Sequence, residues 1–129
     1  MIVQHLKPAF QDERGEITDI LQHVPVDSVT KITCVKGSIR ANHYHKESVQ
    51  YSYVISGEMI AYTQMPGMKV ESCHLFEGDI LTSPPLEKHA LHAVKDSVLI
   101  IITKGPRGGV RYEDDTFRVP HLHLAQTDD

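Results

Sequence analysis

The sequence predicts an all-β fold, built as one domain in a closed barrel or a two-sheet jelly roll. Helical periodicity is nearly absent along the 129 residues, whereas short β-rich runs recur between turn residues. About eight or more strands in a chain of this length imply a sheet that closes on itself or two sheets that stack. The length also suffices for a single domain with its own core, so residues 1–129 are predicted to form one domain.

The predicted strands follow one another from residue 16 to residue 103, with turn residues between them. The turn Asp12–Gly15 precedes the first, and Pro84-Pro85 ends the seventh because proline cannot donate to a sheet. The runs are Glu16–Leu21, Val29–Val35, Ser38–His45, Gln50–Ser56, Glu58–Met65, Val70–Phe76, Ile80–Ser83, His89–Val94 and Ser97–Thr103. The last run is apolar without alternation, which predicts a strand buried on both faces. Residues 105–129 are polar and irregular, and we expect this C-terminal extension to pack back on a barrel core of residues 29–104.

Composition and charge restrict the classes of partner. Hydrophobic residues make up 40% and charged residues 23%, as in ordinary globular proteins. The net charge of −4 without a basic cluster argues against nucleic acids and anionic membranes, and no run reaches the roughly 20 apolar residues of a membrane span. The start has no secretory pattern, and Cys34 and Cys73 lie in strand-like runs, which predicts thiols in the cytoplasm. We expect a homodimer, since jelly rolls of this size expose apolar faces and edge strands.

Two histidines occupy alternate positions of one predicted strand, in the stretch IRANHYHKESVQY. Alternate side chains of a strand lie on the same face, so His43 and His45 can converge on one point. Gln50 begins the next strand after a turn and can point the same way. By alternation, the residues on the opposite face are Arg40, Asn42 and Tyr44. The site is therefore predicted to be a metal centre or a polar substrate pocket, unless these are ordinary surface residues.

A further donor is expected from PPLEKHALHAV, which contains His89 and His92. These residues are three apart and cannot both point inward on a regular strand, and His89, the first after the turn, is the better candidate. Three imidazoles and an amide oxygen form a neutral ligand set. Imidazole suits Zn, Ni, Cu or Fe, and the coordination positions left open suit catalysis more than structure.

These residues resemble the two motifs of the cupin family. The first motif is glycine, five residues, His-x-His, three or four residues, glutamate, six residues and glycine. The residues on this spacing are Gly37, His43, His45, Gln50 and Gly57. In the second motif, Gly78, Pro84 and His89 match, whereas Leu86 and Ala93 replace a glycine and an asparagine. The resemblance covers residues 37–93 and implies a cupin jelly-roll barrel.

Shorter stretches resemble the sugar-nucleotide branch of the cupins. The opening FQDERGEITDI is similar to the Phe-x-Asp-x-Arg-Gly start of rhamnose-pathway 3,5-epimerases. The 3,4-ketoisomerases of deoxysugar nucleotides carry His-x-His-Lys-x-x-x-Gln, and Ala41 replaces a glycine of their pattern. The matching residues are Arg40, His43, His45, Lys46 and Gln50. The resemblance implies an isomerase or epimerase of a keto-deoxysugar nucleotide, such as a dTDP-sugar, in surface polysaccharide biosynthesis.

The resemblance also implies roles for individual residues. A histidine titrates near neutral pH, so His43 suits the base that abstracts a proton next to a ketone. The expected catalytic residues are His43, Tyr44 and Arg40, the expected metal ligands are His43, His45, Gln50 and His89, and the expected substrate-binding residues are Arg40, Lys46, Ser52 and His92. The metal would be Zn, Ni or Fe, held less firmly because Gln50 replaces a carboxylate, and no nucleotide cofactor is expected.

Two other functions remain open on the sequence. The same three histidines and Gln50 could hold the Fe or Ni of a dioxygenase. Alternatively, the pocket could recognise a sugar or an organic acid without catalysis.

Overall fold

The computed structural model describes residues 1–105 and 114–119, and every regular element in these residues is a β-strand. The strands are β1 (Ile2–His5), β2 (Phe10–Asp12), β3 (Gly15–Ile17), β4 (Ser28–Cys34), β5 (Ile39–Tyr44), β6 (Val49–Ser56), β7 (Glu58–Gln64), β8 (Glu71–Phe76), β9 (Asp79–Ser83), β10 (Lys88–Ala93), β11 (Ser97–Lys104) and β12 (Phe117–Arg118). Within the same residues, no helix is long and apolar enough to cross a membrane.

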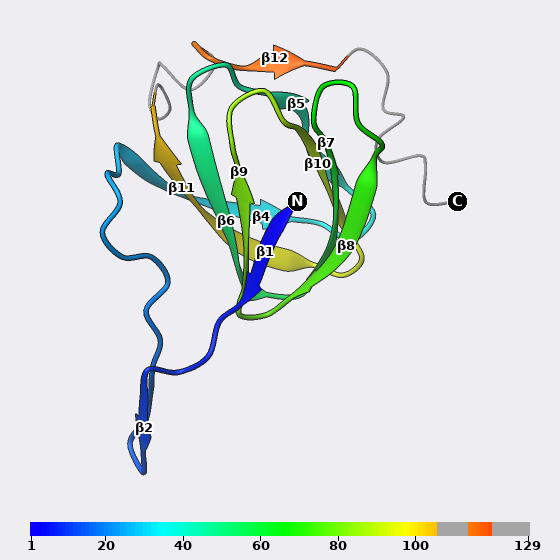
Figure 1. The fold of residues 1–129 in the computed structure, drawn as a ribbon. Coiled ribbons are helices and arrows are strands. Elements are labelled where there is room, and N and C mark those ends of the chain that lie inside the picture. Colours follow the sequence, from blue (N-terminus) through cyan, green and yellow to red (C-terminus); the bar gives the residue numbers. More distant parts are fainter. Residues whose placement is uncertain (106–113, 120–129) are drawn as a thin grey trace.

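Ten of the strands form two antiparallel five-stranded sheets that face each other (Figure 1). One sheet has the order β1-β9-β6-β11-β4 and the other has the order β12-β5-β10-β7-β8. Strands adjacent in the chain, such as β5 and β6, belong to opposite sheets, so the chain crosses repeatedly from one sheet to the other. This arrangement is a jelly roll, which confirms the predicted fold class.

Alternation along the strands separates the core from the surface. In β6, Val54, Ser52 and Gln50 are buried whereas Tyr51 and Tyr53 are half-buried on the outer face, as the two-residue period of a strand requires. The fully buried apolar side chains include Val54, Met59, Leu75, Leu81 and Leu99. The inward positions of β6 thus change from apolar to polar towards the start of the strand. One end of the barrel interior is a hydrophobic core, and the other holds polar side chains.

The predicted strands from residue 29 to residue 103 are confirmed, with ends that differ by at most one residue. The prediction for Glu16–Leu21 was wrong beyond Ile17, where the strand ends. Strand β3 pairs only with β2, in a hairpin that projects from the barrel (Figure 1). Strand β1 was missed; its backbone pairs with β9, from Ile2 opposite Thr82 to His5 opposite Asp79, an edge position that no local pattern marks.

The apolar run of β11 lies between β4 and β6. Leu99 and Ile101 are buried in the interior, whereas Val98 and Ile100 are only half-buried on the outer face. The prediction of burial on both faces therefore holds for Ile102, which is buried on the outer face, but not for Val98 and Ile100.

The C-terminal extension returns to the barrel, as predicted, in the part that the structure describes. Strand β12 pairs with β5, with Phe117 opposite Tyr44 and Arg118 opposite His43. In Figure 1 this strand crosses the top of the barrel. Residues 106–113 and 120–129 of the predicted extension lie outside the described residues.

Candidate functional site

A β-bulge in β5 shapes the site. His89 of β10 pairs with His43, but Ala90 pairs with Ala41, so β5 contains one extra residue, Asn42. Ala41 and Asn42 have φ values of 65° and 60°, in the left-handed region. For Ala41 this conformation costs about 1–2 kcal/mol. In the ketoisomerase pattern that this stretch resembles, glycine stands at this position, and glycine adopts a positive φ without this cost.

Three imidazoles meet inside the barrel next to this bulge. The ring centroid of His43 is 4.7 Å from that of His45 and 4.7 Å from that of His89, and the latter two are 5.2 Å apart. One nitrogen of each ring lies within 4.8 Å of the others. His45 and His89 are each only 3% exposed. The predicted convergence of the His-x-His pair with His89 is confirmed.

Backbone carbonyls orient two of the three rings. The Nδ1 atom of His45 lies 2.6 Å from the Asp115 carbonyl oxygen, and Nδ1 of His89 lies 3.3 Å from the Glu87 carbonyl oxygen. A carbonyl only accepts, so each Nδ1 donates and, in the neutral ring, the lone pair lies on Nε2. Burial, followed by the neighbouring His45, lowers the pKa of His89 from 6.5 to about 4. His89 is therefore neutral at neutral pH.

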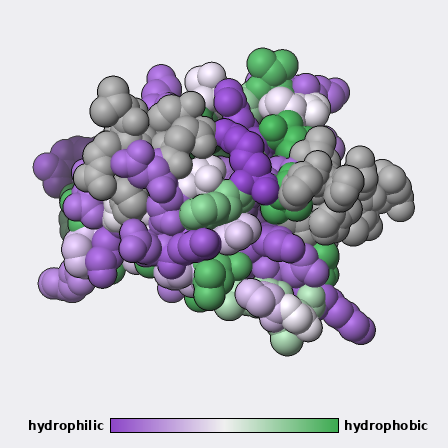
Figure 2. All heavy atoms as spheres, turned by 90° about the horizontal axis from the view of Figure 1, so that it is seen from above, coloured by the Kyte–Doolittle hydropathy of each residue, from purple (hydrophilic) through white to green (hydrophobic). Residues whose placement is uncertain are grey.

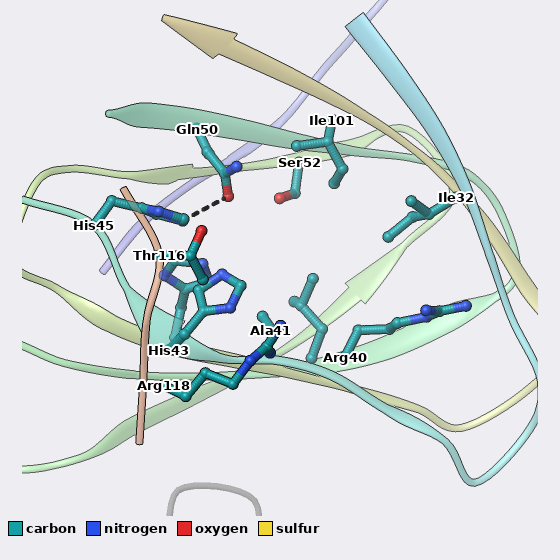
Figure 3. A pocket seen from close by; sticks show the side chains of 12 residues that line it. Ile32, Arg40, Ala41, His43, His45, Gln50, Ser52, Ile101, Thr116 and Arg118 are labelled. Atoms are coloured by element: carbon teal, nitrogen blue, oxygen red, sulfur yellow. Dashed lines mark hydrogen bonds between the residues drawn. The ribbon is translucent and has the colours of Figure 1, made fainter. Parts of the chain in front are cut away.

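Gln50 completes the polar network. Its Oε1 position lies 3.1 Å from Nε2 of His45 (Figure 3). Its Nε2 position lies 3.4 Å from the Thr103 hydroxyl. With a neutral His45, these contacts are best satisfied if the amide NH₂ group points towards His45 and the amide oxygen accepts from Thr103, which is the flipped assignment of the amide. A metal ion bound to Nε2 of His45 would need the lone pair of that nitrogen. The amide NH₂ group of Gln50 would then have to give up its hydrogen bond to His45.

These side chains line a cavity of about 180 Å³. The lining residues are Ile32, Arg40, Ala41, His43, His45, Gln50, Ser52, His89, Leu91, Ile101, Thr116 and Arg118. In Figure 3, His43, His45, Gln50 and Thr116 lie at one end and Arg40 lies at the other. The volume is below the roughly 300–1,000 Å³ of sites for drug-sized ligands. The cavity therefore suits the reacting part of a larger ligand.

Two arginines lie at the mouth of this cavity. Arg40 and Arg118 line it and are both exposed, and the guanidinium of Arg40 donates to the Thr33 carbonyl oxygen at 2.8 Å. Figure 2 looks onto the β12 end of the barrel, where hydrophilic side chains predominate among the described residues. Guanidinium groups pair with the oxygens of phosphate in a bidentate geometry. The mouth is thus suited to an anionic group and the interior to a neutral polar one.

The structure brings together most of the predicted site residues. The cavity is lined by Arg40, His43, His45, Gln50, Ser52 and His89. Alternation placed Arg40 opposite His43, and this was wrong because the bulge interrupts the two-residue period between them. The predicted roles of Arg40 and Ser52 in substrate binding are compatible with their positions.

Three predicted residues do not line the cavity. Tyr44 stacks on Phe117 of β12, with ring centroids 5.4 Å apart, and the Nζ atom of Lys46 lies 4.4 Å from the centroid of the same ring. His92 is half-buried between buried neighbours of β10, with its side chain on the outer face, because His89 and Leu91 point inward. Tyr44, Lys46 and His92 therefore lie outside the lining of this cavity, and the roles predicted for them stay predictions.

The segment Asp114–Val119 contributes residues to the site that were not predicted from the sequence. Thr116 and Arg118 line the cavity, and Asp115 hydrogen-bonds to His45. These residues lie about 70 positions after the His-x-His pair, and no spacing rule links them to it. Their place became apparent only from the pairing of β12 with β5.

The chemistry of the three histidines fits a divalent transition metal. Metal-bound histidines usually donate their second ring nitrogen to a carbonyl or carboxylate, as His45 and His89 do here. Two ligand atoms that each lie about 2.1 Å from an ion are at most about 4.2 Å apart. The ring nitrogens lie within 4.8 Å of one another, so any two of them more than about 4.2 Å apart would have to move closer to bind one ion. His43, His45, His89 and Gln50 are the residues that would hold the ion, which could polarise a substrate oxygen.

Several solved structures superimpose on this chain. A sugar 3,4-ketoisomerase, QdtA from Thermoanaerobacterium thermosaccharolyticum in complex with TDP, has a TM-score of 0.76 at 20% identity and covers 97% of this chain and 92% of that chain. The dTDP-4-dehydrorhamnose 3,5-epimerase from Sulfolobus tokodaii has a TM-score of 0.74 at 19% identity and covers 89% and 74%. The RmlC epimerase of Mycobacterium tuberculosis has a TM-score of 0.76 at 14% identity and covers 91% and 67%. At such identities the likeness establishes the fold.

A family model provides the assignment that these structures leave open. No curated protein sequence matches the chain. The model for the cupin family, in contrast, matches residues 19–123, which include both sheets apart from β1 and all the residues that line the cavity. This chain belongs to the cupin family.

Proposed function

We propose that the protein is an isomerase or epimerase of a keto-deoxysugar nucleotide. The observation that carries the proposal is one cavity with three imidazoles inside and two arginines at its mouth. Such a cavity suits a ligand with a ring to be deprotonated and a diphosphate to be held. The solved ketoisomerase with the same fold contains TDP, which supports this ligand class. We further propose that the protein acts in the cytoplasm, where free thiols such as Cys34 persist, and in surface polysaccharide biosynthesis.

In the proposed reaction, His43 is the base. Its imidazole removes a proton from the carbon next to the ketone, and the electrons of the C–H bond form an enolate. A hydrogen-bond donor in the cavity, such as the Thr116 hydroxyl, stabilises the enolate oxygen. Delivery of a solvent proton to the same carbon from the opposite face re-forms the ketone and gives the epimer. In the isomerase reaction, the hydroxyl on the deprotonated carbon passes its proton to the enolate oxygen, and the proton on His43 goes to the former carbonyl carbon, which gives the isomeric ketone. Arg40 and Arg118 hold the diphosphate outside the cavity.

The test is exchange of solvent deuterium into TDP-4-keto-6-deoxyglucose, the sugar nucleotide present in one solved QdtA structure. The protein is purified without a histidine tag, its bound metal is quantified, and it is assayed in D₂O before and after chelation. We expect catalysed exchange at a carbon adjacent to the ketone, and we expect it to survive chelation, because a neutral imidazole suffices as the base. Binding of the nucleotide without any exchange would indicate recognition only and would refute the proposed catalysis.

The histidine geometry favours one second candidate, a metal-dependent dioxygenase. Two of its three imidazoles already donate Nδ1–H to carbonyl oxygens, as metal ligands do. For this candidate, we expect no deuterium exchange into the sugar nucleotide in the same experiment. Tightly held stoichiometric Fe or Ni, with no exchange into the sugar nucleotide, would favour it over the isomerase.

We also propose that the protein is a homodimer. Large apolar side chains are exposed on the outer face of the β4–β11–β6 region and on the projecting hairpin. These are Val29 (65% exposed), Ile55 (40%), Phe10 (51%) and Ile17 (59%). A second copy could cover them. Sedimentation equilibrium should then give twice the chain mass of 14.5 kDa, and a value equal to one chain at micromolar concentration would contradict the dimer.

A further inference from the structure

The segment Asp114–Val119 is tied to the barrel along its whole length. Strand β12 pairs with β5, and the amide of Val119 donates to the Asn42 carbonyl oxygen at 3.0 Å. At the other end, the side chain of Asp115 reaches the loop that follows His45. The segment therefore contacts the chain just before the His-x-His pair, at Asn42, and just after it, at Lys46. Its residues Thr116 and Arg118 line the cavity.

The carboxylate of Asp115 organises that loop. Its Oδ1 accepts from the amide of Lys46 at 2.9 Å, and its Oδ2 accepts from the amides of Glu47 at 2.8 Å and Ser48 at 2.7 Å. Asp115 is only 4% exposed. Burial alone would raise its pKa, but the hydrogen bonds from these backbone amides outweigh burial and lower the pKa of the carboxyl group. A buried anion held by three consecutive amides has little freedom to move.

The backbone of the same residue orients a ring of the site. The Asp115 carbonyl oxygen accepts from Nδ1 of His45 at 2.6 Å, and Nε2 of His45 faces Gln50 and the cavity. Residue 115 thus holds the loop with its side chain and the imidazole with its main chain. Without the hydrogen bonds between its carboxylate and the loop, the carbonyl oxygen of Asp115 would no longer be held opposite Nδ1 of His45.

We infer that Asp115 is a positioning residue of the site, which keeps His45 in the Nδ1–H tautomer with its Nε2 lone pair towards the cavity. The tautomer of His45 does not depend on the proposed function, whereas the expected effect on turnover does, because His45 lies 4.7 Å from the proposed base His43. The segment Asp114–Val119 therefore contributes to the site, because the imidazole of His45 that it orients lies beside the proposed base His43.

The first test is made on the unchanged protein. In protein labelled with ¹⁵N-histidine, the two ring nitrogens of His45 have different chemical shifts when one carries the proton and the other the lone pair. We expect Nδ1 to be the protonated nitrogen at neutral pH. Protonation at Nε2 instead would overturn the inference, and this result does not depend on whether any variant folds.

The second test replaces Asp115 with Asn. Whichever way the amide is turned, its NH₂ group faces amide donors of the loop, so the segment is pushed away from His45. We expect His45 to become a mixture of tautomers, because a free imidazole is not confined to Nδ1–H. The matched control is Asp27→Asn, since Asp27 also accepts from a backbone amide, that of Gly105 at 2.6 Å, but does not contact His45. An unchanged tautomer in a folded D115N protein would refute the positioning role.

The exchange assay separates this inference from the proposed function. If both hold, D115N lowers kcat about 10- to 100-fold, as loss of an orienting partner typically does, while KM changes little and D27N behaves like the unchanged protein. If the protein catalyses no exchange but its tautomer shifts in D115N, the proposed function fails and the positioning role stands. Normal kcat in D115N, together with an unaltered tautomer, removes the positioning role alone.

Discussion

Replacing His43 with Asn is expected to reduce kcat for deuterium exchange into the sugar nucleotide about 10²- to 10⁴-fold, the range typical for loss of a general base. Asparagine occupies part of the volume of the imidazole but cannot take up a proton. KM should change little, because the arginines proposed to hold the diphosphate, Arg40 and Arg118, are untouched. The measurement is exchange followed by NMR at several substrate concentrations.

A matched control separates this effect from a general effect of histidine removal. His74 on β8 is about half exposed and contacts Glu58 at 3.0 Å, and it does not line the cavity. H74N should therefore exchange deuterium at the rate of the unchanged protein. Full activity in H43N, with a circular dichroism spectrum like that of the unchanged protein, would show that another group is the base.

Replacing Gly57 with Ala is expected to lower the free energy of unfolding by about 2–5 kcal/mol. Gly57 has a φ of 98°, and a Cβ there would lie 2.2 Å from Oγ of Ser97 and 2.6 Å from the Asp96 carbonyl oxygen. The left-handed conformation contributes about 1–2 kcal/mol, and forcing the neighbours apart contributes about 1–3 kcal/mol. Ser97 cannot turn aside freely, because its hydroxyl donates to Lys95 at 2.8 Å and accepts from Glu58 at 3.1 Å.

The control for this prediction is Gly37→Ala, in the other glycine of the first cupin motif. Gly37 has a φ of 87°, but a Cβ there would have no atom within 4 Å. Only the backbone contribution of about 1–2 kcal/mol remains. Urea denaturation of both variants at one protein concentration measures the difference. Equal losses for the two alanine variants would show that the close approach at Gly57 is relieved by a small shift.

Local pattern sufficed for the strands and for part of the site. The strands from β4 to β11 were predictable because one face of each is buried and the chain alternates along it, and because glycine and proline mark the turns. His43, His45, Gln50 and His89 were predictable as one group because the two-residue period and the motif spacing place them on facing strands. The two motif glycines look alike in the sequence, and only the packing of Ser97 against Gly57 distinguishes them.

The sequence by itself thus determined the jelly roll and its inward-facing histidines, whereas the tertiary structure decided which other residues join them. Because of the bulge at Asn42, Arg40 lines the cavity although strict alternation would place it on the opposite face. Tyr44 and Lys46 contact Phe117 of β12 instead of the cavity. Asp115 meets Lys46 across 69 positions of the chain. Periodicity reports only which face of an element is buried. Contacts between distant segments depend on where the chain returns, and that is settled by the packing of the whole barrel.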